Sequence, residues 1–327
     1  MHILIVNNTQ IPALKYGGTE RVIWWLGKQL VQSGHKVSYL VAKGSTCPFA
    51  DVYEYTTEIP FNKLVPETVD VIHLQHRVNE IPLKPYIITM HGNMNEQVEL
   101  DLNTVFVSKN HANRFGSDSF VYNGIDFDDY GKPELSNKQN YIHFLGDAAW
   151  RVKNVRGAID IAKKAHTPIK IIGGKRFNFN QGIRLTFDPN AHFCGMVGGV
   201  EKNNLLQNSN ALLFPVLWNE PFGLAIVESL YFGCPVFGTP YGSLPELVSP
   251  EVGFLSNQKS SLVEAVKNLT QFSRKTCHEY AVENFSSGKM AKQYVQCYEK
   301  VLNGISINYV NPMLNQIQPQ KFLPFYS

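Results

Sequence analysis

The chain of 327 residues is 44% hydrophobic and 17% charged, with a formal net charge of +3. This near balance of charge excludes the strongly basic character of most nucleic-acid-binding proteins, and five scattered cysteines without CxxC spacing argue against a disulfide framework or a zinc site. From the length and the cysteine pattern we expect a cytoplasmic globular protein of two domains. Because the chain has no run of about 18 apolar residues, any membrane contact is expected to be peripheral, at the inner membrane face.

The first part of the chain alternates apolar runs with helical segments. Residues 2–6 and 37–41 are predicted strands, and residues 19–32 between them form a predicted helix. Such a βαβ unit implies a parallel sheet. The loop before the helix contains Gly17 and Gly18, and without side chains it would let the backbone approach a phosphate or a sugar closely. An ordinary flexible turn explains these two glycines equally well.

Two later apolar runs are each followed by a histidine. The run at residues 69–74 leads to His76, and the run at residues 86–90 leads directly to His91. Because ligands bind at the carboxyl ends of parallel strands, both side chains are expected at the ligand edge of the sheet. A histidine there more often serves only as a structural hydrogen-bonding group, and that alternative stays open. His73, inside its strand, is expected in the core.

A stretch rich in Asp, Gly, Pro, Ser and Asn, residues 128–140, is the best candidate for a linker. Residues 1–127 then form a first domain, and a second series of alternating strands and helices begins at residue 141. We expect this second domain to extend over residues 141–289.

In the second domain, two basic residues follow a glycine at the end of the first strand. Gly146 ends this apolar run, and Arg151 and Lys153 come shortly after, just before a predicted helix at residues 155–165. A guanidinium group makes forked contacts with phosphate oxygens, and a lysine adds a compact positive charge. The loop therefore suits phosphate binding, although Asp147, directly after the glycine, would oppose it.

The most informative stretch is residues 215–238. The apolar run at residues 211–215 predicts a short buried strand, and residues 222–231 have helical periodicity. Pro221 suits the first turn of that helix. The stretch is therefore predicted to be strand, loop and helix.

Two carboxylates flank the start of this helix. Glu220 lies in the loop, Phe222, Gly223 and Leu224 lie at the helix start, and Glu228 lies about two turns along. Free amides and the helix dipole favour an anion, whereas carboxylates accept hydrogen bonds from sugar or ribose hydroxyls. The combination suits a nucleotide sugar better than a bare phosphate. Two solvated glutamates on a surface helix are the alternative.

The extended string resembles the E-x7-E region of retaining glycosyltransferases of the GT-B fold, in particular family 4. It consists of Glu220, Phe222-Gly223-Leu224, Glu228, Gly233-Cys234-Pro235-Val236 and Glu246. Residues 123–126, Asn-Gly-Ile-Asp, are similar to the signature at the end of that family's first domain. The resemblance implies an α/β protein with two Rossmann-like domains whose parallel sheets face a central cleft, and residues 290–327 are expected to return to the first domain.

The same resemblance implies an enzyme of the EC 2.4 class. It would move a hexose or related sugar, with retention, from a nucleoside-diphosphate sugar to a carbohydrate, lipid-linked or small-molecule acceptor. The first domain would hold the acceptor and the second the donor. No metal is implied, no cofactor beyond the donor as co-substrate, and no nucleic acid partner.

Site residues are carried over on the matching positions. Asp147 stands where the family has an arginine, and Arg151 is the expected substitute. A sugar-nucleotide epimerase of the same fold, or a relative that binds the donor without turnover, is the alternative. The catalytic residues implied are His91 and Glu220, and the donor-binding residues are Gly17, Gly18, Arg151, Lys153, Gly195, Met196, Phe222, Gly223, Leu224 and Glu228.

Overall fold

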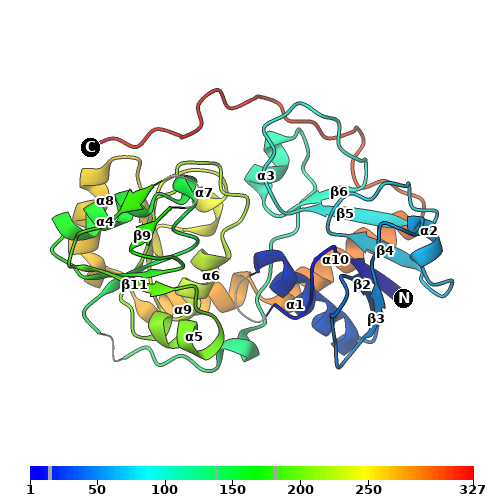
Figure 1. The fold of residues 1–327 in the computed structure, drawn as a ribbon, viewed down its shortest axis with the longest axis horizontal. Helices are drawn as coiled ribbons and strands as arrows, with labels where there is room; N and C mark the ends of the chain where they lie inside the picture. Colours follow the sequence, from blue (N-terminus) through cyan, green and yellow to red (C-terminus); the bar gives the residue numbers. More distant parts are fainter. Residues whose placement is uncertain (14–16, 137–138, 180–182) are drawn as a thin grey trace. The chain divides into compact units, whose positions relative to one another are not determined.

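The computed structural model describes residues 1–13, 17–136, 139–179 and 183–327. The chain divides into two compact units, each built on its own sheet (Figure 1). Unit 1 contains Met1–Ala13, Gly17–Asp126 and Phe285–Gln318, and unit 2 contains Phe127–Asn284 and Pro319–Ser327.

Unit 1 is organised around a parallel sheet of six strands. The strand order is β3-β2-β1-β4-β5-β6, with the first strand of the chain near the centre. Leu4, Leu40 and Ile72 pack in one apolar cluster with the short helix α2 (Phe61–Leu64). Because the strands are parallel, their carboxyl ends share one edge of the sheet. The strands are β1 (His2–Val6), β2 (Lys36–Val41), β3 (Asp51–Glu54), β4 (Val71–Leu74), β5 (Tyr86–Met90) and β6 (Thr104–Phe106).

The main helices of unit 1 come from opposite ends of the chain. Helix α1 (Gly18–Gln32) packs against β2 and against α10 (Ser287–Leu302), which also contacts β5. Met290, Tyr294 and Tyr298 of α10 recur every four residues and are buried, which gives this helix an apolar face toward the unit. The short helix α3 (Lys109–Arg114) begins at Ser108, whose hydroxyl accepts the amide of His111.

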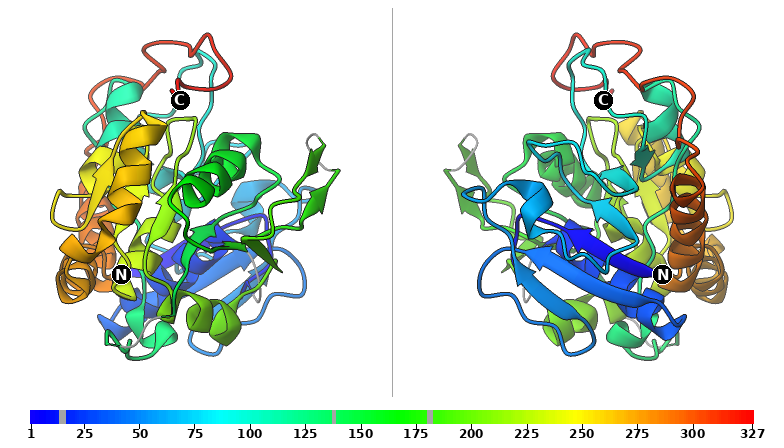
Figure 2. Two further views of the ribbon diagram at one scale, coloured as in Figure 1. Left: turned by 90° about the vertical axis from the view of Figure 1, so that its left-hand side faces the viewer. Right: turned by 90° about the vertical axis from the view of Figure 1, so that its right-hand side faces the viewer.

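Unit 2 repeats the arrangement with its own six parallel strands, in the order β11-β8-β7-β12-β13-β14. A separate two-stranded antiparallel hairpin, β9 (Phe177–Asn178) and β10 (Arg184–Leu185), is inserted between β8 and β11 and extends away from the sheet (Figure 2, green). The sheet strands are β7 (Ile142–Leu145), β8 (Ile169–Ile172), β11 (Ala191–Gly195), β12 (Leu212–Phe214), β13 (Val236–Gly238) and β14 (Gly253–Leu255).

Helices of unit 2 pack in pairs, α4 against α8 and α6 against α9. Asn154 caps α4, because its side-chain oxygen accepts the amide of Gly157 at 3.0 Å. The helices are η1 (Phe127–Tyr130), η2 (Arg151–Lys153), α4 (Val155–Lys164), α5 (Gly199–Gln207), α6 (Leu224–Tyr231), α7 (Leu244–Leu247), α8 (Lys259–Lys267), η3 (Leu269–Gln271) and α9 (Arg274–Asn284).

The tail differs from the sequence expectation. Residues up to Gln318 belong to unit 1, as expected of the whole tail, but Pro319–Ser327 belong to unit 2. Phe325 packs against the apolar core of that unit, and Tyr326 exchanges backbone hydrogen bonds with Asn257 and Lys259. The partly buried aromatic ring and the paired backbone hold this last segment on unit 2.

The prediction of an α/β protein with two parallel sheets is confirmed. Among the described residues, no helix combines the length and the apolar composition that crossing a bilayer requires.

Candidate functional site

The candidate site of unit 2 lies at the carboxyl edge of its sheet, where loops after neighbouring strands touch. Gly173, at the end of β8, has a φ of +113°, and a Cβ placed there would lie 2.2 Å from the carbonyl oxygen of Gly146 at the end of β7. The amide of Gly173 donates to the carbonyl of Gly195 at the end of β11. Three strand ends are therefore joined through backbone, which only a residue without a side chain permits at Gly173.

The outer end of this row is open. Among the described residues, no atom outside Gly195 and its two chain neighbours lies within 4 Å of the place where a Cβ on Gly195 would be. Met196, which follows it, is exposed. A planar group could therefore approach the backbone here and lie beside the Met196 side chain.

The loop after β7 sends its polar side chains to different partners. Asp147 accepts the amide of Ala149 at 2.8 Å, so this carboxylate forms a turn. Arg151 lies with its guanidinium 5.1 Å from the centre of the Phe322 ring, in the tail. Lys153, two residues on, turns instead to Glu220. The structure therefore separates Arg151 from Lys153, although both were predicted to contact the same diphosphate.

Lys153 and Glu220 form a buried ion pair. The ammonium lies 2.6 Å from Glu220 Oε2, and the two side chains are 12% and 7% exposed. Trp218 Nε1 donates to the same oxygen at 2.8 Å. The ammonium also lies about 5 Å from the ring centres of Phe214 and Trp218. A cation and an anion that were predicted from separate motifs are thus brought together beside aromatic rings.

The same carboxylate lies beside the start of α6. Gly223, the residue before this helix, has a φ of +93°, and no side chain of the residues that the structure describes caps the helix. A Cβ on Gly223 would lie 3.4 Å from Glu220 Cγ. Leu224 is the first helical residue, and its amide is one of those for which an α-helix supplies no partner. Phe222 is buried, and its carbonyl accepts the Ser243 hydroxyl at 2.6 Å.

Glu228, the second predicted carboxylate, is held by two residues that the sequence did not indicate. Its Oε1 atom is contacted by the ammonium of Lys202, from α5, and accepts the hydroxyl of Tyr130 at 2.6 Å. Glu228 and Lys202 are both buried. Neither partner has a spacing that points to Glu228, since Tyr130 lies 98 residues before it and Lys202 lies 26 residues before it.

In unit 1, His91 follows β5 and bonds to Gln75, which follows the neighbouring strand β4. His91 Nε2 lies 2.6 Å from Gln75 Oε1, and since that oxygen can only accept, Nε2 carries the hydrogen. Burial lowers the pKa of His91 to about 4, so the ring is neutral at pH 7. Parallel pairing of β4 with β5 brings the two residues together. A prediction that these strands are neighbours would therefore also have predicted the contact between Gln75 and His91.

Of the other two histidines predicted for this sheet, His76 is half-buried and His73 is buried. His76 packs edge-on against Tyr55, and neither of its ring nitrogens has a hydrogen-bond partner in the described part of the chain. Burial lowers its pKa. His73 bonds to Tyr298 and Thr89 inside the unit, which places it in the core as expected.

The two predicted glycines of unit 1 lie at the start of α1. Gly17 precedes the helix and Gly18 is its first residue. The carbonyl of Gly17 accepts a hydrogen bond from Arg21 Nε at 3.1 Å, and a Cβ at Gly17 would collide with the Glu20 carboxylate. These contacts fix the backbone at the helix start.

Comparisons with known proteins bear on this arrangement. Residues 126–283 match the family model of glycosyl transferases group 1. Over 275 residues the chain is 24% identical to D-rhamnosyltransferase WbpZ of Pseudomonas aeruginosa, covering 74% of this chain and 69% of that one. Over 197 residues it is 28% identical to an uncharacterized 41.2 kDa protein in the cps region of Klebsiella pneumoniae, covering 55% of this chain. That match spans 54% of the Klebsiella protein, about half its length.

Solved structures show the fold. AviGT4, a glycosyltransferase involved in avilamycin A biosynthesis, superposes with a TM-score of 0.76 at 19% identity, covering 93% of this chain and 98% of that one. Anabaena Alr3699/HepE, solved in complex with UDP-glucose, superposes with a TM-score of 0.64 at 16% identity, covering 92% and 100% of the two chains. The predicted GT-B fold is confirmed by these superpositions and by the two parallel sheets.

Proposed function

We propose that this protein is a retaining, family 4-like glycosyltransferase. The premise is that residues 126–283 are a glycosyl transferases group 1 domain and that the fold is GT-B. It would transfer a sugar from a nucleoside-diphosphate sugar to a hydroxyl group of a saccharide, lipid-linked or small-molecule acceptor. The observation that carries the proposal is the pair of Lys153 and Glu220 beside the amides that open α6. WbpZ and the UDP-glucose complex of the Anabaena protein support the substrate class.

The donor diphosphate would bind where positive charge and free amides meet. We propose that Lys153 and the amide of Leu224 stabilise the negative charge that grows on the leaving diphosphate. The positive end of the α6 dipole acts on the same charge. When the donor diphosphate binds, Lys153 contacts both the diphosphate and Glu220. The carboxylate thereby limits the affinity of the site for the unreacted donor.

Glu220 would position the sugar. Its carboxylate accepts hydrogen bonds from sugar hydroxyls, and the Trp218 indole fixes its orientation by donating to Oε2. The bond from sugar C1 to the diphosphate oxygen breaks, and the acceptor oxygen bonds to C1 on the same face. The acceptor proton passes to the departing phosphate oxygen, so no protein nucleophile is required.

The remaining donor contacts within unit 2 follow from the same placement. Glu228, held by Lys202 and Tyr130, would accept the ribose hydroxyls. The nucleotide base would lie over Gly195 and beside Met196, where the surface is open. Gly17 and Gly18 of unit 1 would contact the donor through their backbone.

Unit 1 would supply the acceptor side. We propose that the neutral ring of His91, oriented by Gln75, hydrogen-bonds a sugar hydroxyl and does not act as a cation. The proposed charge stabilisation by Lys153 and amides requires no metal, so activity should persist in excess EDTA.

The test is an assay of donor turnover. The protein is incubated with UDP-, GDP- and ADP-sugars and a panel of acceptors, and the anomeric configuration of any product is determined by NMR. A glycoside with the configuration of the donor supports the proposal. An epimerised donor formed without acceptor would instead identify an epimerase, and donor binding without any product would identify a binding protein.

A further inference from the structure

The β9–β10 hairpin of unit 2 carries large apolar side chains on its outer face. Leu185 pairs with Phe177 across the hairpin, and side chains of a strand alternate between faces. Phe177 and Leu185 therefore lie on one face, and Phe179, Ile183 and Phe187 flank the two strands. Their side chains, Phe177, Phe179, Ile183, Leu185 and Phe187, are between 48% and 77% exposed.

The opposite face of the hairpin is polar and buried. Arg184 is 5% exposed, donates to the carbonyl of Lys175 at 2.7 Å and to the Thr186 hydroxyl at 2.8 Å, and lies over the Phe193 ring. Arg176 donates to backbone carbonyls of the returning strand. This polarity is the reverse of that of an ordinary surface hairpin, and the arginine bonds fix it. The apolar face is therefore held outward.

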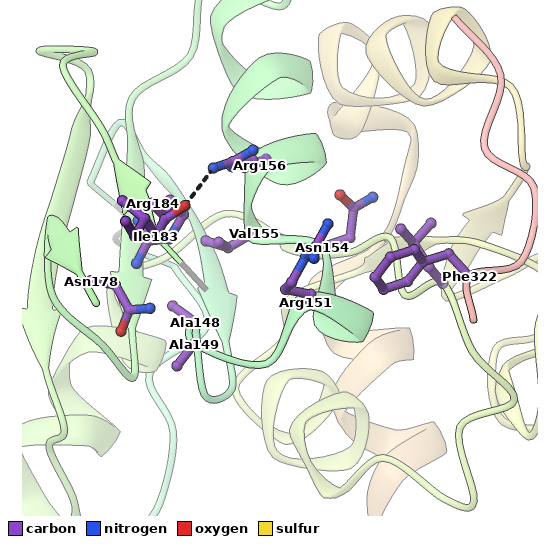
Figure 3. A pocket seen from close by; sticks show the side chains of 11 residues that line it. Ala148, Ala149, Arg151, Asn154, Val155, Arg156, Asn178, Ile183, Arg184 and Phe322 are labelled. Carbon is purple, nitrogen blue, oxygen red and sulfur yellow. Dashed lines mark hydrogen bonds between the residues drawn. The ribbon is translucent and has the colours of Figure 1, made fainter. Parts of the chain in front are cut away.

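A pocket of about 360 Å³ lies at the base of the hairpin (Figure 3). It is lined by the start of α4, by the tail residue Phe322 and by Ile183, which also belongs to the apolar face. The guanidinium groups of Arg151, Arg156 and Arg184 surround it, and Arg156 donates to the carbonyl of Ile183 at 3.0 Å. The pocket and the apolar face thus form one continuous surface, which we call the hairpin surface.

Three arginines, Arg151, Arg156 and Arg184, give this surface positive charge without a paired carboxylate in the described part of the chain. Burial, and then the charge of Arg156, lower the pKa of Arg184. The sequence of residues 173–187 contains three basic residues and no acidic one. An anion would be favoured in the pocket, which α4 also faces with its N-terminus.

We propose that the hairpin surface docks on an anionic phospholipid membrane, with the apolar face inserted among the acyl chains and the pocket receiving a lipid phosphate. Exposed aromatic and aliphatic side chains next to unpaired cations match the boundary where acyl chains meet phosphates. A second copy of the chain would bring the same cations against each other, which disfavours self-association through this surface. The inference does not depend on the proposed sugar transfer.

The experiment is sedimentation of the whole chain with vesicles of phosphatidylcholine alone and of phosphatidylcholine with phosphatidylglycerol. Wild-type protein should sediment with the anionic vesicles and less so as salt is raised. A variant with Phe179→Ser and Phe187→Ser should have an affinity for the anionic vesicles that is lower by about tenfold or more, because two inserted rings are lost. Arg156→Gln should weaken binding to anionic vesicles only.

A matched control removes similar apolar surface elsewhere. Ile81 and Leu83 of unit 1 are 80% and 86% exposed, so Ile81→Ser with Leu83→Ser should bind vesicles as the wild type does. Melting curves check that every variant is folded. The proposal is overturned if wild-type protein stays in the supernatant, if the hairpin variant binds unchanged, or if light scattering shows a wild-type dimer that the hairpin variant converts to monomer.

Discussion

Replacing Lys153 by methionine tests both the stability and the chemistry of the candidate site. Methionine keeps most of the volume beside Phe214 and Trp218 but removes the charge that lies 2.6 Å from Glu220. Both side chains are about nine-tenths buried, so the carboxylate is left without its cation in a place that water hardly reaches. Removing one partner of a buried pair costs about 3–5 kcal/mol. The Trp218 hydrogen bond remains, so we expect a loss near the lower limit.

A double-mutant cycle separates the pair from its surroundings. Glu220→Gln keeps an acceptor for Trp218 and removes the negative charge, and the double variant Lys153→Met with Glu220→Gln leaves no unpaired charge. We expect the double variant to be more stable than Lys153→Met alone, with a coupling energy of about 1.5 kcal/mol or more. The free energy of unfolding is measured by urea titration with tryptophan fluorescence, since Trp218 lies in the site.

The functional arm uses calorimetry of the same variants with nucleotide sugars. Loss of the Lys153 charge should weaken donor binding by more than about 1 kcal/mol. Arg156→Gln, which removes a cation elsewhere in unit 2, should bind the donor as the wild type does. If Lys153→Met unfolds at the wild-type urea concentration and binds the donor unchanged, the ion pair neither stabilises unit 2 nor holds the diphosphate.

Three further changes test other parts of the structure. Tyr130→Phe removes one hydrogen bond to buried Glu228 and should lower the free energy of unfolding by about 1 kcal/mol, measured in urea, with weaker donor binding by calorimetry. Gly223→Ala forces a side chain to a φ of +93°, which should cost about 1–2 kcal/mol in the same titration and reduce donor affinity; unchanged values would show that the helix start is not constrained. His91 has a folded pKa of about 4 against an ordinary 6.5, so the unfolded chain takes up its proton first as pH falls; between pH 7 and pH 5 this one group should lower stability by about 2 kcal/mol. Urea titrations at both pH values should show a smaller difference for His91→Gln, and an equal difference would contradict the assigned pKa.

The strands and helix α6 could be predicted from the sequence because short-range patterns of apolar residues indicate them. The runs at residues 2–6 and 86–90 coincide with β1 and β5, and the helix predicted over 222–231 is α6, which begins two residues later. Gly223 delays its start, because its left-handed backbone lies outside the helix. The helical periodicity of the apolar residues does not show at which residue α6 begins.

The side-chain partners could not be predicted, because they are long-range. Tyr130 and Lys202 approach Glu228 only after η1, α5 and α6 have packed, and a buried lysine on a helix has no sequence signature. No hairpin was predicted from the sequence at residues 177–187. The alternation of Phe177, Phe179, Ile183 and Leu185 is typical of a strand with an apolar face toward a core, whereas the structure turns that face outward.

Unit 1 is assembled from pieces separated by most of the chain, and this has a consequence for biosynthesis. Its sheet leaves the ribosome first, but α10, whose Tyr294 and Tyr298 line the core around His73, is translated only after the whole of α9. The sheet of unit 1 therefore keeps the surface that α10 will cover exposed until residues 127–284, nearly all of unit 2, have been synthesised. A nascent chain stalled when residue 284 has just left the ribosomal exit tunnel should be protected from protease over residues 127–284 and cleaved over residues 1–126.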